Sequence, residues 1–168
     1  MIVPGVTGAF SQIVFLRGLE KSLIGIIDKP RELAKALEWR TELAINCIEE
    51  LAQMGAECIW LGEGPASSSI ISPQQYQRFV LPFQKELIKA MRRKGIYSII
   101  HTCGDINNSL HLIAETTTDA IDLDYPVELR KAIDTIGDKV CIKGNINPQE
   151  LMDFSEKEIY QMCIKKSR

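Results

Sequence analysis

A histidine and a cysteine stand two residues apart in this chain, directly after an apolar run. His101 and Cys103 follow residues 96–100, and Gly104 comes next. If the run is a β-strand, residues i and i+2 point to the same side, so the imidazole and the thiol converge. Both groups are natural zinc ligands, and a catalytic zinc needs a third protein ligand besides. The spacing therefore predicts a zinc site at His101 and Cys103, although a strand-end histidine that is only hydrogen-bonded in the core fits it too.

Other polar side chains follow the remaining apolar runs. These runs end in Glu63, in Asp122 and Asp124, and in Asn145 and Asn147. Active groups of parallel α/β sheets gather at the carboxyl ends of the strands. We therefore expect Glu63, as an oxygen ligand or general base, and Asp122 to be catalytic, and Asn145 to bind a cofactor. The alternatives are a solvated Glu63, aspartates that organise a turn, and Asn147 as a helix cap.

Short β-branched runs alternate with helical patterns, which predicts right-handed βαβ units and a parallel sheet. Strands are expected at 58–61, 96–100, 120–123 and 140–143, with a doubtful one at Ile2 and Val3. Helices are expected over 8–17, 30–54 and 127–136, from a capping box at Ser72 to Gly95 with a kink at Pro82, after Asn147, and after Ser155. A closed barrel needs eight strands, so the pattern favours an open α/β sheet or part of a barrel.

Composition narrows the class of protein. The 168 residues fit one domain spanning 1–168, with 45% hydrophobic and 25% charged residues and a net charge of −2. This charge balance gives no electrostatic field that would favour binding to nucleic acid or to an acidic membrane. No signal peptide or run of roughly 20 apolar residues is recognisable. Five cysteines, an odd number, then indicate reduced thiols in a cytoplasmic protein.

The order of the motifs resembles the uroporphyrinogen decarboxylase superfamily. The matching segments are Leu81-Pro82, His101-Thr102-Cys103-Gly104, Ile121-Asp122-Leu123-Asp124-Tyr125-Pro126 and Lys143-Gly144-Asn145-Ile146-Asn147-Pro148. The similarity runs along nearly the whole chain but covers the second half of that family's barrel. The resemblance thus implies a partial (β/α)₈ barrel, roughly its C-terminal half.

Within the superfamily, His-x-Cys-Gly is similar to the zinc motif of the methylcobamide:coenzyme M methyltransferases and related corrinoid enzymes. That similarity implies zinc held by His101 and Cys103, and a zinc-bound thiolate of a small-molecule acceptor that attacks a methyl group on cobalt. The corrinoid would be carried by a partner protein. The family's remaining cysteine ligand lies in a later Gly-Cys segment, which this chain does not reach before Arg168.

Two further hypotheses stay open. A uroporphyrinogen decarboxylase fragment would use no metal, but it would carry a Ser-x-Ala-Gly stretch where this chain has Gly64-Pro65-Ala66-Ser67. The N-terminal arginines and catalytic aspartate of the decarboxylases belong to the other half of that barrel. A non-catalytic half-barrel is the third hypothesis. Because half a barrel leaves sheet edges unpaired, we also expect a homodimer.

Overall fold

A five-stranded parallel sheet forms the centre of the computed structural model, which describes residues 2–166. The strands pair in the order in which they occur along the chain. They are β1 (Gly5–Thr7), β2 (Cys58–Gly62), β3 (Tyr97–Thr102), β4 (Ala120–Leu123) and β5 (Cys141–Lys143). Parallel neighbours in sequential order require a crossover after each strand, and helices supply these crossovers, as in a β/α barrel.

The helices connect the strands in long and short segments. They are α1 (Ala9–Arg17), α2 (Leu19–Asp28), α3 (Pro30–Gln53), η1 (Gly64–Ala66), α4 (Pro73–Phe79), α5 (Leu81–Arg93), α6 (Leu110–Ala114), α7 (Leu129–Ile136), α8 (Pro148–Asp153) and α9 (Glu156–Lys166). A capping box at Ser72 begins α4, and proline at the first helical position begins α3, α4 and α8.

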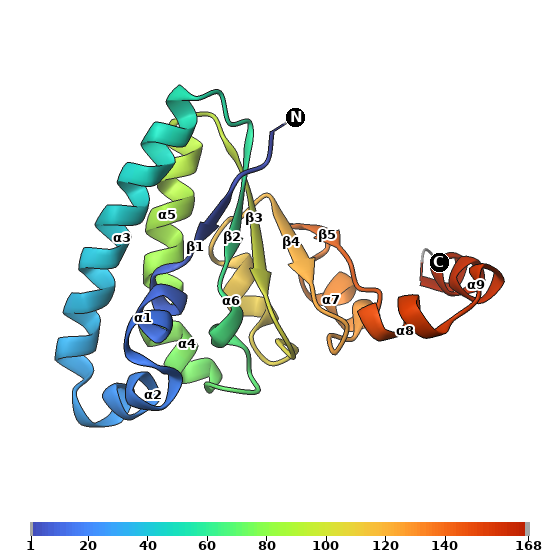
Figure 1. The fold of residues 1–168 in the computed structure, drawn as a ribbon, viewed down its shortest axis with the longest axis horizontal. Helices are drawn as coiled ribbons and strands as arrows, with labels where there is room; N and C mark the ends of the chain where they lie inside the picture. The colour runs from blue at the N-terminus through green and yellow to red at the C-terminus, as the bar shows by residue number, and fades with distance from the viewer. Residues whose placement is uncertain (1, 167–168) are drawn as a thin grey trace.

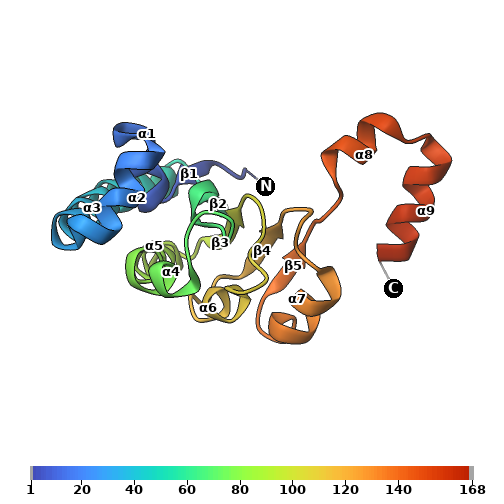
Figure 2. The ribbon, with the colours of Figure 1, turned by 90° about the horizontal axis from the view of Figure 1, so that it is seen from below.

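One face of the sheet is covered and the other is open. Seen along the strands, the sheet is an arc with α5, α6 and α7 on its outer side and no described helix packed on its inner side (Figure 2). Burial alternates accordingly: Ile100 and Ile121 face the helices and are fully buried, whereas His101 and Asp122 face the open side and are partly exposed. The open face corresponds to the interior of a barrel, so the chain is a partial (β/α)₈ barrel.

Several predicted elements need correction. The strand expected at Ile2 and Val3 is wrong, because the first strand pairs with β2 at Gly5–Thr7 instead. The helix predicted to be kinked at Pro82 is instead divided into α4 and α5 at Val80. Proline is tolerated in the first turn of a helix but not in its interior, and Pro82 lies in the first turn of α5. The separate helix α2 has no counterpart among the predicted elements.

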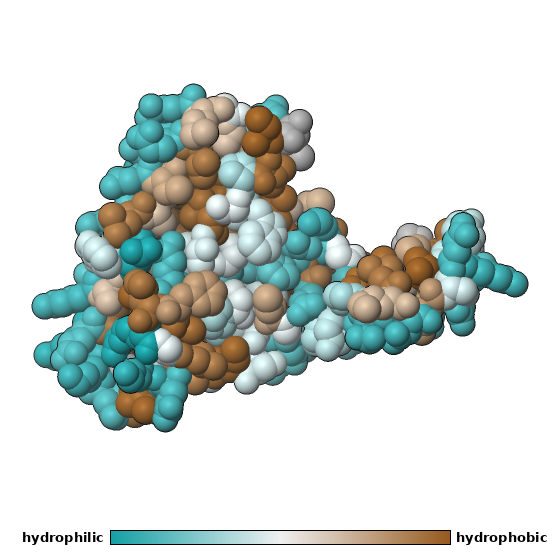
Figure 3. Space-filling view, viewed as in Figure 1, coloured by the Kyte–Doolittle hydropathy of each residue, from teal (hydrophilic) through white to brown (hydrophobic). Residues whose placement is uncertain are grey.

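The last two helices extend away from the sheet as a C-terminal arm, defined as α8 and α9 (Figure 1). Large hydrophobic side chains remain exposed on this arm, among them Met152, Phe154 and Tyr160. A second group, with Phe15, Leu16 and Ile27, is exposed on α1 and α2 (Figure 3). Among the described residues, no helix is long and apolar enough to span a membrane.

Candidate metal centre

The end of β3 brings His101 and Cys103 together. His101 Nε2 lies 3.3 Å from Cys103 Sγ, as expected for residues i and i+2 of an extended segment. Gly104 follows with a φ of 83°, so the chain turns away immediately after the cysteine. The predicted convergence of imidazole and thiol is therefore present, at the carboxyl end of the sheet.

The histidine ring has a defined orientation. Its Nδ1 lies 2.9 Å from the backbone oxygen of Asp122 on the neighbouring strand. A carbonyl oxygen only accepts hydrogen bonds, so Nδ1 carries the hydrogen and Nε2 presents its lone pair toward the thiol. Metal-ligating histidines use the same arrangement, in which the second ring nitrogen donates to a carbonyl or carboxylate.

The pair fits two corners of a tetrahedral zinc site. Typical zinc–nitrogen and zinc–sulfur bonds place the two ligand atoms roughly 3.6 Å apart, close to the 3.3 Å observed. Burial first, and Asp124 second, raise the pKa of the Cys103 thiol, so the metal-free thiol is less acidic than usual. Among residues 2–166, no three His, Cys, Asp or Glu side chains are arranged so that together they could hold a metal ion.

Asp122 lies beside the pair on β4. Its Oδ2 is 4.0 Å from His101 Nδ1, 2.9 Å from Lys143 Nζ and 3.2 Å from the indole nitrogen of Trp60. The predicted catalytic carboxylate is thus at the site, with a cation and an N–H donor on the same oxygen. Neither Trp60 nor Lys143 was singled out from the sequence, although strand alternation places both on the face that carries His101.

Glu63 is joined to the site through its backbone, and its carboxyl group is buried against α1. Its side chain is 1% exposed, and Oε1 accepts a hydrogen bond of 2.7 Å from the Ser11 N–H in the first turn of α1. The solvated alternative is therefore wrong. Its own backbone N–H donates to His101 O at 2.8 Å. Burial raises the pKa of this carboxyl to about 7, because desolvation outweighs the hydrogen bonds from α1.

Asn145 joins the two loops that follow β4 and β5. It is 2% exposed, and its Nδ2 donates to Val127 O at 2.6 Å and to Asp124 O at 3.3 Å. Asp124 in turn accepts the Gly104 N–H at 2.6 Å. These contacts support the rim of the site, and the cofactor-binding role of Asn145 stays a prediction. Asn147 caps α8 by accepting the N–H of Gln149, which confirms the helix-cap alternative.

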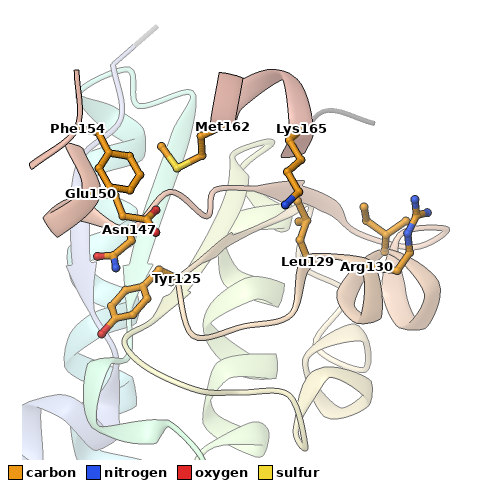
Figure 4. Close-up of a pocket in the computed structure, with 9 residues that line it drawn as sticks. Tyr125, Leu129, Arg130, Asn147, Glu150, Phe154, Met162 and Lys165 are labelled. Atoms are coloured by element: carbon orange, nitrogen blue, oxygen red, sulfur yellow. The ribbon is translucent and has the colours of Figure 1, made fainter. Parts of the chain in front are cut away.

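A hollow beside the C-terminal arm lies away from these side chains. A cavity of about 520 Å³ separates α7 from the C-terminal arm and is lined by Tyr125, Asn147, Phe154 and Met162, among others (Figure 4). None of the predicted site residues lines it. Its walls come from α7 and the loop before it on one side and from the C-terminal arm on the other, away from the strand end that carries His101.

The parallel strands, joined by helices and carrying a histidine–cysteine pair and a carboxylate at their carboxyl ends, define a partial β/α barrel. The chain belongs to the uroporphyrinogen decarboxylase (URO-D) family, whose model matches residues 2–166.

Similar proteins come from two branches of this family. Methylcobamide:CoM methyltransferases MtbA from Methanosarcina acetivorans and Methanosarcina mazei are 24% and 23% identical over 90% and 98% of this chain. A uroporphyrinogen decarboxylase from Chlorobium luteolum is 34% identical over 62% of this chain, which covers 30% of that enzyme. The chain spans 44% and 48% of the two methyltransferases, about half of their length.

A solved structure supports the fold. A methyltransferase from Methanosarcina mazei superimposes with a TM-score of 0.77 and 24% identity, over 86% of this chain and 42% of the other.

Proposed function

We propose that these residues form the C-terminal half of a zinc-dependent methyltransferase, in which a methyl group passes from a corrinoid to a thiol or similar small acceptor. The observation that carries the proposal is the His101–Cys103 pair, with 3.3 Å between Nε2 and Sγ and with Nδ1 already held by a carbonyl. Similarity to two methylcobamide:CoM methyltransferases supports the same reaction class.

Each residue then has a proposed part. His101 and Cys103 hold the metal, and the Asp122 carbonyl keeps the imidazole in the ligating tautomer. When bound, zinc supplies a Lewis acid that makes a coordinated acceptor thiol nucleophilic at neutral pH. Asp122 and Glu63 are the proposed catalytic carboxylates, Asp122 beside the metal ligands and Glu63 beneath them. Asn145 is proposed to contact the cofactor from the rim.

The proposal implies particular partners. A corrinoid carried by a partner protein would supply the methyl group, and a small-molecule acceptor would receive it. A cytoplasmic location suits this chemistry, because a ligating thiol must stay reduced, and all five cysteines of this chain are free. A second copy of the chain is proposed to pair with it as a homodimer.

Zinc stoichiometry tests the proposal most simply. We expect the purified chain to retain zinc, and the His101→Ala, Cys103→Ala double variant to lose it. A matched control removes one histidine and one cysteine away from the site, His111→Ala with Cys47→Ala, both exposed. Equal zinc content in all three proteins would contradict the assignment.

The decarboxylase branch is the second candidate, favoured by the 34% identity to the Chlorobium luteolum enzyme. It predicts a chain that holds no zinc and instead quenches the fluorescence of added uroporphyrin on binding. A chain that does neither would be a half-barrel without chemistry of its own.

A further inference from the structure

A row of mostly polar positions crosses four neighbouring strands on the open face of the sheet. The register pairs Gly62 with His101, His101 with Asp122, and Asp122 with Lys143. Trp60 lies two residues before Gly62 and therefore on the same face. Branched apolar side chains usually fill the interior of a β/α barrel, so a polar row with an indole at one end indicates a functional arrangement.

The indole of Trp60 lies over the glycine and against the histidine. Its ring stacks on the imidazole of His101, with 5.1 Å between the centroids and 22° between the planes. A Cβ added at Gly62 would lie 2.6 Å from Trp60 Cζ3, far inside van der Waals contact. The indole thus occupies the space that any other side chain at position 62 would take.

We propose that Trp60 is a positioning residue of the site: its indole, admitted by Gly62, holds the His101 ring so that Nδ1 stays on the Asp122 carbonyl and Nε2 faces Cys103. The stack holds the plane of the imidazole and hinders its rotation about the Cβ–Cγ bond. Within that plane, the hydrogen bond from Nδ1 to the Asp122 carbonyl selects the orientation in which Nε2 faces the thiol. The ring orientation exists without metal, and only its consequence for metal affinity rests on the proposed function.

Lys143 completes the arrangement from the other side. Its Nζ lies 2.9 Å from Asp122 Oδ2, the oxygen that also accepts the Trp60 indole N–H at 3.2 Å. Two donors on one oxygen fix the carboxylate, and the fixed carboxylate keeps the indole in its plane. Because the lysine side chain is 61% exposed, the ion pair alone contributes little to stability. Its role here is to orient the Asp122 oxygen that also accepts the indole N–H.

The tautomer of His101 reports the proposed role directly. The chain has two histidines, and the exposed His111 on α6 gives an internal reference for an unrestrained ring. Long-range proton–nitrogen NMR spectra of the metal-free protein should show Nδ1–H for His101. Trp60→Leu and Gly62→Ala should both shift it toward the tautomer mixture of His111.

Two further variants serve as controls. One tests whether the aromatic ring of Trp60 or its N–H group is needed, and the other tests whether replacing a different tryptophan has the same effect. Trp60→Phe keeps an aromatic plane over the imidazole and should keep the Nδ1–H tautomer. Trp39→Phe replaces a half-exposed tryptophan on α3 and should change nothing. If Trp60→Leu fails to fold by circular dichroism, Gly62→Ala and Trp60→Phe still decide between the outcomes.

The proposal is overturned if His101 in the parent lacks the Nδ1–H tautomer, or if folded Trp60→Leu and Gly62→Ala retain it unchanged. Zinc affinity is then measured on the same proteins, and these two variants should bind about 10- to 100-fold more weakly, as losses of orienting contacts do. A parent that binds no zinc while its variants lose the tautomer would refute the proposed function and leave the positioning role intact.

Discussion

Glu63 is a carboxyl group buried between the end of β2 and the first turn of α1. Gly8, the residue before α1, has no side chain that could cap the helix, and the Glu63 carboxyl accepts the Ser11 N–H in its place. A carboxylate at a helix N-terminus is favoured by the helix dipole, but full burial disfavours its charge. The effect of burial is the larger one and raises the pKa of Glu63 to about 7. The free energy of unfolding therefore depends on pH through the protonation of Glu63.

Glu63→Gln should therefore flatten the pH dependence of unfolding. In the parent, the folded carboxyl keeps its proton up to about pH 7, whereas the unfolded chain releases it near pH 4.5. The native state binds more protons at Glu63 in this window, so the contribution of Glu63 to the free energy of unfolding is largest below pH 4.5 and falls as pH rises to 7. The difference between the folded and unfolded pKa values of Glu63 corresponds to a contribution of on the order of 3 kcal/mol to the free energy of unfolding.

Urea unfolding between pH 4 and 8.5 measures this slope, with Glu42→Gln on the exposed face of α3 as the control. A glutamine at position 63 still accepts the Ser11 N–H, so its fold should be kept. Parallel curves for the parent and Glu63→Gln would show that the carboxyl is not protonated in the folded protein.

At the scale of the elements, α1 begins where β1 ends and packs directly on the Glu63 side chain. The approach is close: a Cβ at Gly8 would lie 1.5 Å from Glu63 Oε2. The φ of Gly8 is −65°, an angle that any residue adopts, so space and not backbone conformation requires glycine here.

Gly8→Ala should consequently displace Glu63 and destabilise the protein by about 1–3 kcal/mol, as overpacked sites do. Gly25→Ala is the matched control inside α2, where the nearest atoms are the Arg17 guanidinium nitrogens at 3.7 Å. It should be neutral or stabilise by about 0.5–1 kcal/mol. Thermal unfolding compares the two variants, and equal melting temperatures would refute the contact.

Local patterns predicted the elements better than the contacts between them. The capping box at Ser72 and the strand before Cys103 depend on neighbouring residues, and both were predicted from the sequence. The partner of Glu63 is 52 positions away, so its burial could not be inferred. The stacking of Trp60 on His101 requires the β2–β3 register, which no local pattern specifies.

At the scale of the whole molecule, the sheet has two edges, β1 and β5, each paired on one side in the described structure. Unpaired edges and exposed apolar side chains on the C-terminal arm favour association. We therefore predict a homodimer. Sedimentation equilibrium over a micromolar concentration series should give twice the mass of 18.9 kDa, and a stable monomer throughout would contradict the prediction.

A metal held by His101 and Cys103 is central to the proposed function, and cobalt(II) substitution tests this directly. Cobalt(II) occupies zinc sites and gives a near-ultraviolet absorption band when a thiolate binds it. We predict this band in the parent and in Cys47→Ala, and its loss in Cys103→Ala and His101→Ala. A band that persists in Cys103→Ala, or one that never forms in the parent, would contradict the proposed metal site.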